Sequence, residues 1–433
     1  MRLRARAPRV GVYRMAARRR DLLSGMATGL GLGIAGVAMP RGSHALAGTP
    51  PRLPDKKSLV VGALFPLSGP LAALGNECLR GVQLATDLCN AGGGLLGRNV
   101  SLALGDASDP DRAVAEARRL ISDKQPALIF GTGDSMLSLG ASEVSEGSGV
   151  PYWELTGTMP AITTRSFHYL LRLCDTEAGV AECSQEAIAT VIASALRRPA
   201  AQLSVALLYA DDSPGSALQP LIAAAAHRRG LNPPMSIAYQ PGAADFGALA
   251  ERLAVMQPDV LIHNGLAEEV VLLFTALAAR DWRPPVLIGV SAAYGSTETA
   301  AMVGPGFEGT LTVGVVPYGV DARLAPNAGM VATLYEQNFG ASPRSGLSFS
   351  HFAGAGLCFD ILGLAKSADK DKVLAVVRGI TLARGTLANG WGAMFGQDGQ
   401  NLRAFSCLSQ WQKGQQVALL PKDGAAGALR LRN

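Results

Sequence analysis

The stretch LVVGALFPL (residues 59–67) is a continuous apolar run, as expected of a strand buried on both faces of a parallel sheet. The turn residues Ser68-Gly69-Pro70 end the run. Between residues 79 and 89, apolar side chains recur every three or four positions, which predicts a helix that stops at the glycines of 92–94. A buried strand followed by an amphipathic helix is the repeating unit of an α/β fold.

The alternation of strand and helix continues along the chain. Further strands are expected at 99–104, 127–130, 150–155, 203–209, 260–263, 286–290 and 311–316. Further helices are expected after the cap Asp109 and at 136–147, 180–197, 215–229, 246–256 and 267–280. Because the pattern restarts after Cys174, the sequence predicts two α/β lobes, each a doubly wound parallel sheet. A ligand held between two such lobes closes them by hinge motion.

The basic character of the chain is confined to its first 47 residues. Nine arginines and one aspartate give this segment a net charge of +8, and the whole chain carries +5, so the remaining residues carry −3. No cluster of Lys or Arg occurs outside this leader, and we therefore expect no nucleic-acid partner.

Residues 1–47 have the organisation of an export signal. Arg19-Arg20 precedes an uncharged run at 22–39, and Ala45-Leu46-Ala47 has the small-x-small pattern that a signal peptidase needs. The arginine pair resembles a twin-arginine signal, so we expect cleavage after Ala47 and a soluble body in the periplasm. The alternative is an uncleaved anchor, since the run has a length at the short limit for spanning a bilayer. No other stretch is predicted to be long and apolar enough to do so.

The six cysteines all follow the leader and show no CxxC spacing. With only five histidines in the chain, a zinc site is not expected, and no other cofactor is expected either. Cys174 and Cys183 flank a short segment and are the candidate disulfide pair in an oxidising compartment. Cys78 and Cys89 fall on one predicted helix, too far apart to bridge, and are expected to be buried thiols.

Four stretches in order resemble the type I periplasmic solute-binding proteins of ABC importers, in the branched-chain amino acid, amide and urea group. They are residues 62–70, 90–98, 109–120 and the hairpin 396–401. The resemblance covers nearly all of residues 58–421 and implies lobes joined by a three-strand hinge, with crossings near 174–178, 314–318 and 388–394. It places the first lobe at 58–174 plus 317–390 and the second lobe at 177–314 plus 391–433.

The resemblance also implies a ligand site at two strand-to-helix turns of the first lobe. Ser135 matches a hydroxyl of the family at the first turn. At the second turn Thr158 matches another hydroxyl, Thr156 a backbone contact, and Gly157 lies between them. Free N–H groups at a helix start, with a hydroxyl beside them, hold a carboxylate or amide oxygen. The alternatives are an ordinary N-cap for Ser135 and an ordinary turn for the threonines.

The sequence departs from the family at the end of the site that binds an amine. Leu266 and Ser291 stand where amino-acid binders place an aromatic hydroxyl and a carboxylate, and Leu74 replaces an aromatic residue of the first turn. A buried ammonium without a charged partner is costly, so a standard α-amino acid is not the expected ligand.

Other residues near these turns have two interpretations each. Asp134 either meets a cation or caps a helix, and Glu154 either faces the cleft or a solvated edge. Met136, Trp153 and Leu266 either line an apolar part of the site or pack in the core. Together with Leu74 they favour a ligand with a sizeable apolar part.

The predicted function is therefore that of a binding protein without catalysis. The chain has no G-x-S-x-G elbow, no Walker A loop and no histidine cluster, so an enzyme is not expected. The expected partners are a small-molecule ligand and an inner-membrane permease, and the chain is expected to act as a monomer. The alternatives are a carrier of a larger apolar ligand, aromatic or lipid-like, and the ligand-sensing component of a receptor.

Overall fold

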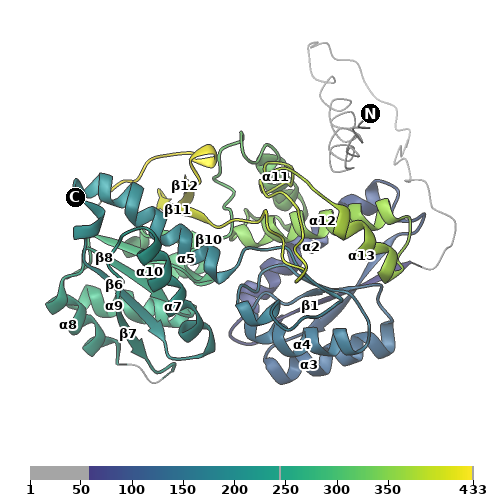
Figure 1. Cartoon of the computed structure of the whole chain (residues 1–433), viewed down its shortest axis with the longest axis horizontal. Helices are drawn as coiled ribbons and strands as arrows, with labels where there is room; N and C mark the ends of the chain where they lie inside the picture. The colour runs from purple at the N-terminus through teal and green to yellow at the C-terminus, as the bar shows by residue number, and fades with distance from the viewer. Residues whose placement is uncertain (1–57, 243–244, 432–433) are drawn as a thin grey trace, which may run out of the picture.

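The computed structural model describes residues 58–242 and 245–431, which form two sheets at the centres of two lobes (Figure 1). The export signal predicted at 1–47 lies outside the described residues. Parallel strands covered by helices make up most of both lobes, which confirms the predicted α/β class.

The first sheet is parallel throughout and has the order β2-β1-β3-β4-β5. Its strands are β1 (Leu59–Phe65), β2 (Val100–Asp106), β3 (Ile129–Gly131), β4 (Tyr152–Glu154) and β5 (Leu170–Arg172). The apolar run of β1 lies between two neighbours, with Val61 opposite Leu102 and Gly62 opposite Ile129. Burial between two strands and two helical layers explains why this stretch has no polar side chain.

Three helices connect the strands of the first sheet: α2 (Ala72–Ala91), α3 (Pro110–Arg119) and α4 (Ser135–Gly147). Asp109 caps α3 as predicted, because its carboxylate accepts a hydrogen bond from the Arg112 N–H at 2.8 Å. A π-helical turn at Leu120–Lys124 extends α3.

The second sheet has the order β12-β11-β10-β9-β8-β6-β7. Its strands are β6 (Val205–Ala210), β7 (Met235–Tyr239), β8 (Val260–Asn264), β9 (Val286–Gly289), β10 (Leu311–Gly314), β11 (Cys407–Gln412) and β12 (Gln415–Leu420). The last two form an antiparallel hairpin, coloured yellow in Figure 1, so this sheet is not wholly parallel as the sequence predicted. The sequence pattern also did not predict β7, an edge strand whose mixed burial leaves no apolar run.

The helices of the second lobe begin just after the first crossing. They are α5 (Glu177–Glu186), α6 (Ala193–Leu196), α7 (Ser213–Arg228), α8 (Phe246–Met256), α9 (Ala267–Ala279) and α10 (Thr297–Val303). A π-helical segment at Ala187–Ile192 joins α5 to α6. Short 3-10 turns lie at Pro160–Ile162, Ala200–Gln202, Ala292–Gly295, Gly304–Phe307 and Lys422–Gly424.

After β10 the chain returns to the first lobe as α11 (Ala328–Phe339), α12 (Gly346–Ala365) and α13 (Lys370–Gly379). Helix α12 packs closely along α2, and a Cβ atom at Gly81 would lie only 2.2 Å from the Ser348 carbonyl oxygen. The buried Glu77 carboxylate of α2 accepts hydrogen bonds from the Tyr335 and Ser348 hydroxyls, both at 2.6 Å. This carboxylate therefore ties α2 to both α11 and α12.

Helix α12 corrects one sequence-based expectation. Its length and mean hydropathy of 1.4 would suit a membrane span, although the sequence analysis found no such stretch beyond the leader. In the structure 78% of that apolar window is buried, so α12 is the core helix of the first lobe.

Three connections join the lobes: residues 173–176, 315–327 and 380–406. The lobes also touch through the loop before α12. The Arg344 carbonyl accepts a hydrogen bond from the Thr297 N–H at 2.9 Å, and its guanidinium pairs with Glu298 of α10. The Arg344 N–H donates to Glu77, so one residue contacts both lobes.

All six cysteines are buried free thiols. The expectation of buried thiols at Cys78 and Cys89 is confirmed. Cys174 and Cys183, the candidate disulfide pair, are not bonded to each other. Cys174 Sγ instead lies 3.3 Å from the Gly157 carbonyl oxygen, while Cys183 lies on α5 in the second lobe.

Two buried histidines should make stability depend on pH. Burial lowers the pKa of His351 to about 4 and that of His263 to about 3. The unfolded chain binds protons at these histidines near pH 6.5, whereas the folded chain resists protonation until the pH is lower. The stability that the neutral histidines contribute is therefore complete above pH 6.5, and it is lost as the pH falls toward their folded-state pKa values.

We predict that His351→Gln, which cannot titrate, loses less stability than the wild type between pH 7 and pH 5. The two losses should differ by about 2 kcal/mol, because a histidine whose pKa is lowered to about 4 on folding destabilises the folded state by that amount over this pH range. Urea unfolding at the two pH values measures it. Equal losses in the two proteins would show that His351 is not held neutral.

Candidate functional site

The predicted site lies where β3 and β4 end in the first lobe. Residues 131–135 lead from β3 into α4, and residues 155–160 follow β4. In the second sheet, α7 begins after β6 and α9 after β8. In parallel sheets these carboxyl edges are where ligands bind.

The first turn is held by a helix cap and a close packing contact. Asp134 Oδ1 accepts hydrogen bonds from the N–H groups of Met136 at 2.8 Å and Leu137 at 3.3 Å, so Asp134 caps α4. Gly133 has a φ of +96°, and a Cβ atom there would lie 2.8 Å from Leu74 Cδ2. Leu74 thus covers this turn, and Met136 lies partly buried behind it.

Glu154 holds the second turn in place, whereas the sequence favours either the cleft or a solvated edge for its carboxylate. Glu154 is fully buried, and its Oε1 accepts hydrogen bonds from the Thr156 N–H at 2.9 Å and the Gly157 N–H at 2.7 Å. Its other oxygen accepts from the Ser138 hydroxyl of α4. Burial raises the pKa of Glu154, while these hydrogen bonds oppose that rise. The N–H of Gly157 is therefore already used.

The Ser135 hydroxyl joins the two turns. It accepts hydrogen bonds from the N–H groups of Thr158 at 3.0 Å and Met159 at 3.2 Å. Among the described residues it has no acceptor for its own proton, and the Ser135 N–H has no partner either. Ser135 can therefore donate two hydrogen bonds to an oxygen at the start of α4.

The two threonines of the second turn differ in what they leave available. His351 Nδ1 lies 2.8 Å from the Leu347 carbonyl, which can only accept, so this nitrogen carries the proton. Nε2 is then an acceptor for the Thr156 hydroxyl at 3.0 Å, and the Thr156 side chain is committed. The half-buried Thr158 hydroxyl has no hydrogen bond among the described residues.

A buried arginine supports the second turn from beneath. The Arg172 guanidinium donates to the carbonyls of Met159 at 2.6 Å and Gly157 at 3.4 Å, to Thr163, and to the Gln400 side chain. The Gln400 amide in turn donates to the Cys174 carbonyl at 2.8 Å. The hairpin at 396–401 thus anchors the end of β5 where the chain leaves the first lobe.

The remaining predicted residues lie in two different surroundings. Leu266 is 55% exposed at the start of α9, where its N–H donates to Glu269. Ser291 donates to the Gly265 carbonyl at 2.7 Å, so these two predicted positions lie at the same edge of the second sheet. Trp153 is fully buried in the first-lobe core, with its ring 6.4 Å from that of Phe395.

The sequence analysis missed the residues that support the two turns. Ser138, Arg172 and His351 contact the predicted site from a helix, a strand end and a distant helix. Two of them are buried charged or titratable residues, and buried polar side chains are unusual unless they are bonded. Only the surroundings, which the sequence does not show, distinguish them from surface residues.

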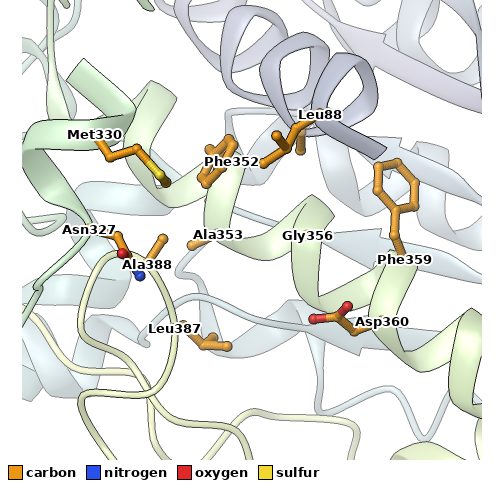
Figure 2. Close-up of a pocket in the computed structure, with 11 residues that line it drawn as sticks. Leu88, Asn327, Met330, Phe352, Ala353, Gly356, Phe359, Asp360, Leu387 and Ala388 are labelled. Carbon is orange, nitrogen blue, oxygen red and sulfur yellow. The ribbon is translucent and has the colours of Figure 1, made fainter. Parts of the chain in front are cut away.

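A separate apolar cavity of about 40 Å³ lies within the first lobe, between α2, α11 and α12 (Figure 2). Its lining consists of Ala85, Leu88, Asn327, Met330, Phe352, Ala353, Gly356, Phe359, Asp360, Leu387 and Ala388. None of these residues belongs to the two turns. The cavity has room for little more than a few water molecules, so it is not a pocket for a large apolar solute.

Comparisons with known proteins show which sequences and structures the chain is similar to. The sequence model of the family described as "Periplasmic binding protein" matches residues 58–416. The chain is 32% identical over 372 residues to the "Leu/Ile/Val-binding protein homolog 8" of Brucella abortus, covering 86% of this chain and 92% of that protein. It is also 32% identical over 387 residues to homolog 7 of Brucella suis, covering 89% and 96%.

Solved structures share the fold at lower sequence identity. A leucine-binding protein of Thermotoga maritima superimposes with a TM-score of 0.71 at 18% identity, over 84% of this chain and 99% of that one. A solute-binding protein of an ABC transporter from Rhodopseudomonas palustris, in complex with 3,4-dihydroxybenzoic acid, gives 0.70 at 19% identity, over 86% and 98%.

We predict that Glu154→Leu destabilises the protein by about 3 kcal/mol, because it leaves buried N–H groups without acceptors. Glu154→Gln should cost about 1 kcal/mol or less, since the amide oxygen still accepts both N–H groups and its nitrogen can donate to Ser138. Equilibrium urea unfolding of the two variants tests this. Equal costs would mean that Glu154 does not clamp the turn.

Proposed function

The chain belongs to the periplasmic binding protein family, and on that premise we propose that it captures a small carboxylate- or amide-bearing solute between its lobes for an inner-membrane ABC importer. The family consists of exported solute-binding proteins, so the prediction of a non-enzymatic protein is confirmed. The twin-arginine export route, the monomeric state and the lobe boundaries stay predictions.

The pair of hydroxyls on Ser135 and Thr158 is the observation that carries this proposal. The two turns are fixed by Asp134, Glu154 and Arg172, so these donors are positioned before a ligand arrives. Preorganised donors cost little entropy on binding. An oxygen between them would accept from the Ser135 N–H and from both hydroxyls.

The proposed ligand is not a standard α-amino acid. The positions that would hold its ammonium carry the exposed Leu266 and the neutral Ser291, whose hydroxyl is bonded to the Gly265 carbonyl. Leu74, Met136 and Leu266 instead favour a ligand with an apolar part, such as an aromatic acid. Delivery to an importer, in place of a receptor role, would be supported by loss of solute uptake in cells that lack the chain.

We predict that Ser135→Ala weakens binding of the solute by about 1.5–3 kcal/mol, the range for a hydrogen bond to a charged group. Native mass spectrometry of protein purified from the periplasm identifies the solute, and calorimetry with that compound measures its affinity. Ser145→Ala is the control, because this buried serine of the same helix bonds only the Val150 carbonyl. Unchanged affinity in Ser135→Ala would contradict the proposed site.

A further inference from the structure

Glu177 is a buried carboxylate that the site described above does not use. It is the first residue of α5, directly after the first connection between the lobes, and is only 6% exposed. Its Oε2 has no hydrogen-bond partner among the described residues. Buried carboxylate oxygens are normally bonded, so this one requires an explanation.

The position of Glu177 links it to the proposed ligand site. Its N–H donates to the Thr158 carbonyl at 2.9 Å, so it adjoins the second turn. Helix α5 packs against α7, whose capping residue Asp212 is exposed where β6 ends. Glu177 therefore lies between the ligand-side turn of the first lobe and the carboxyl edge of the second sheet.

The surroundings of Glu177 are negative. Asp212 lies close enough to raise the pKa of both Glu177 and Asp134. Burial is the main cause that raises the pKa of Glu177, to about 7, and Arg172 is the one positive group that opposes it. The Arg172 guanidinium already serves Gln400 and the carbonyls of the second turn, and no hydrogen bond joins it to Glu177 among the described residues.

We propose that Glu177 is the acidic contact for a cationic group of the ligand, so that the substrates are small amphoteric solutes with both an oxygen-bearing end and an ammonium or amidinium. This inference rests on the proposed function and narrows it. The sequence lacked a carboxylate at Leu266 and Ser291, and Glu177 supplies one at the hinge end of the site instead. A cation there pairs with the unpartnered Oε2 of Glu177, and the nearby negative charges of Asp134 and Asp212 stabilise it further.

The test compares acids with and without an amine on the same carbon frame. The probes are 5-aminopentanoate against pentanoate and 4-(aminomethyl)benzoate against 4-methylbenzoate, each measured by calorimetry at pH 8. In the wild type the aminated member of at least one pair should bind at least tenfold more tightly. Glu177→Gln should remove that preference, while Glu182→Gln, at a half-buried position of the same helix that pairs with Arg228, should keep it.

The pH dependence provides a readout that a merely structural role would not change. Below about pH 7 Glu177 takes up a proton, so the wild type should lose affinity for the aminated probe between pH 8 and pH 6. Asp134, Asp212 and Arg172 are present in both proteins, so a flatter profile in Glu177→Gln isolates the contribution of Glu177. Circular dichroism and thermal unfolding check that the variant is folded.

The outcomes separate this inference from the function it rests on. If the acids bind without preference for the aminated members, or if Glu177→Gln keeps the preference, the acidic contact is overturned while a carboxylate site stands. If no probe binds, the acidic contact is overturned too. Unchanged affinity in Ser135→Ala bears only on the proposed oxygen site.

Discussion

The ligand-side face of the first lobe depends on the need to satisfy buried backbone N–H groups where β4 ends. Four consecutive residues, 156–159, follow the end of β4, and their amides find no partner in the sheet. Glu154 accepts from the first two and Ser135 from the last two. An unmade hydrogen bond at each would be costly, so the two turns are held as one unit.

This arrangement changes how the site recognises an oxygen. The N–H groups of residues 156–159 are bonded within the protein, and the Thr156 hydroxyl is bonded to His351. The second turn therefore has the Thr158 hydroxyl to offer a ligand. At the first turn the Ser135 N–H has no partner among the described residues, and it lies at the start of a helix whose dipole favours a negative group. In the proposed site, recognition of a solute would therefore rest on a small number of preset donors.

The connections between the lobes are tied to the same region. Arg172 and Gln400 join the end of β5 to the last connection, and Glu177 begins α5 beside Thr158. On the other side Arg344 contacts Glu77 in one lobe and Glu298 in the other. Movement of one lobe about these connections would alter the surroundings of Glu177 and Arg344 first, since each contacts groups on both sides.

The sequence by itself determined the strand–helix alternation, the two α/β lobes and the cap at Asp109, because each depends on local periodicity or a short motif. The roles of Ser135 and Thr158 came from the resemblance to the family and stay predictions. It did not show β7, the antiparallel end of the second sheet or the burial of α12. The tertiary structure alone decided that Ser135 bonds a turn 23 residues away and that Arg172 meets a side chain 228 residues away. It alone left Oε2 of the buried Glu177 without a hydrogen bond among the described residues. Such contacts follow from sheet order and side-chain packing, and a linear pattern carries no record of which distant groups a buried charge will face.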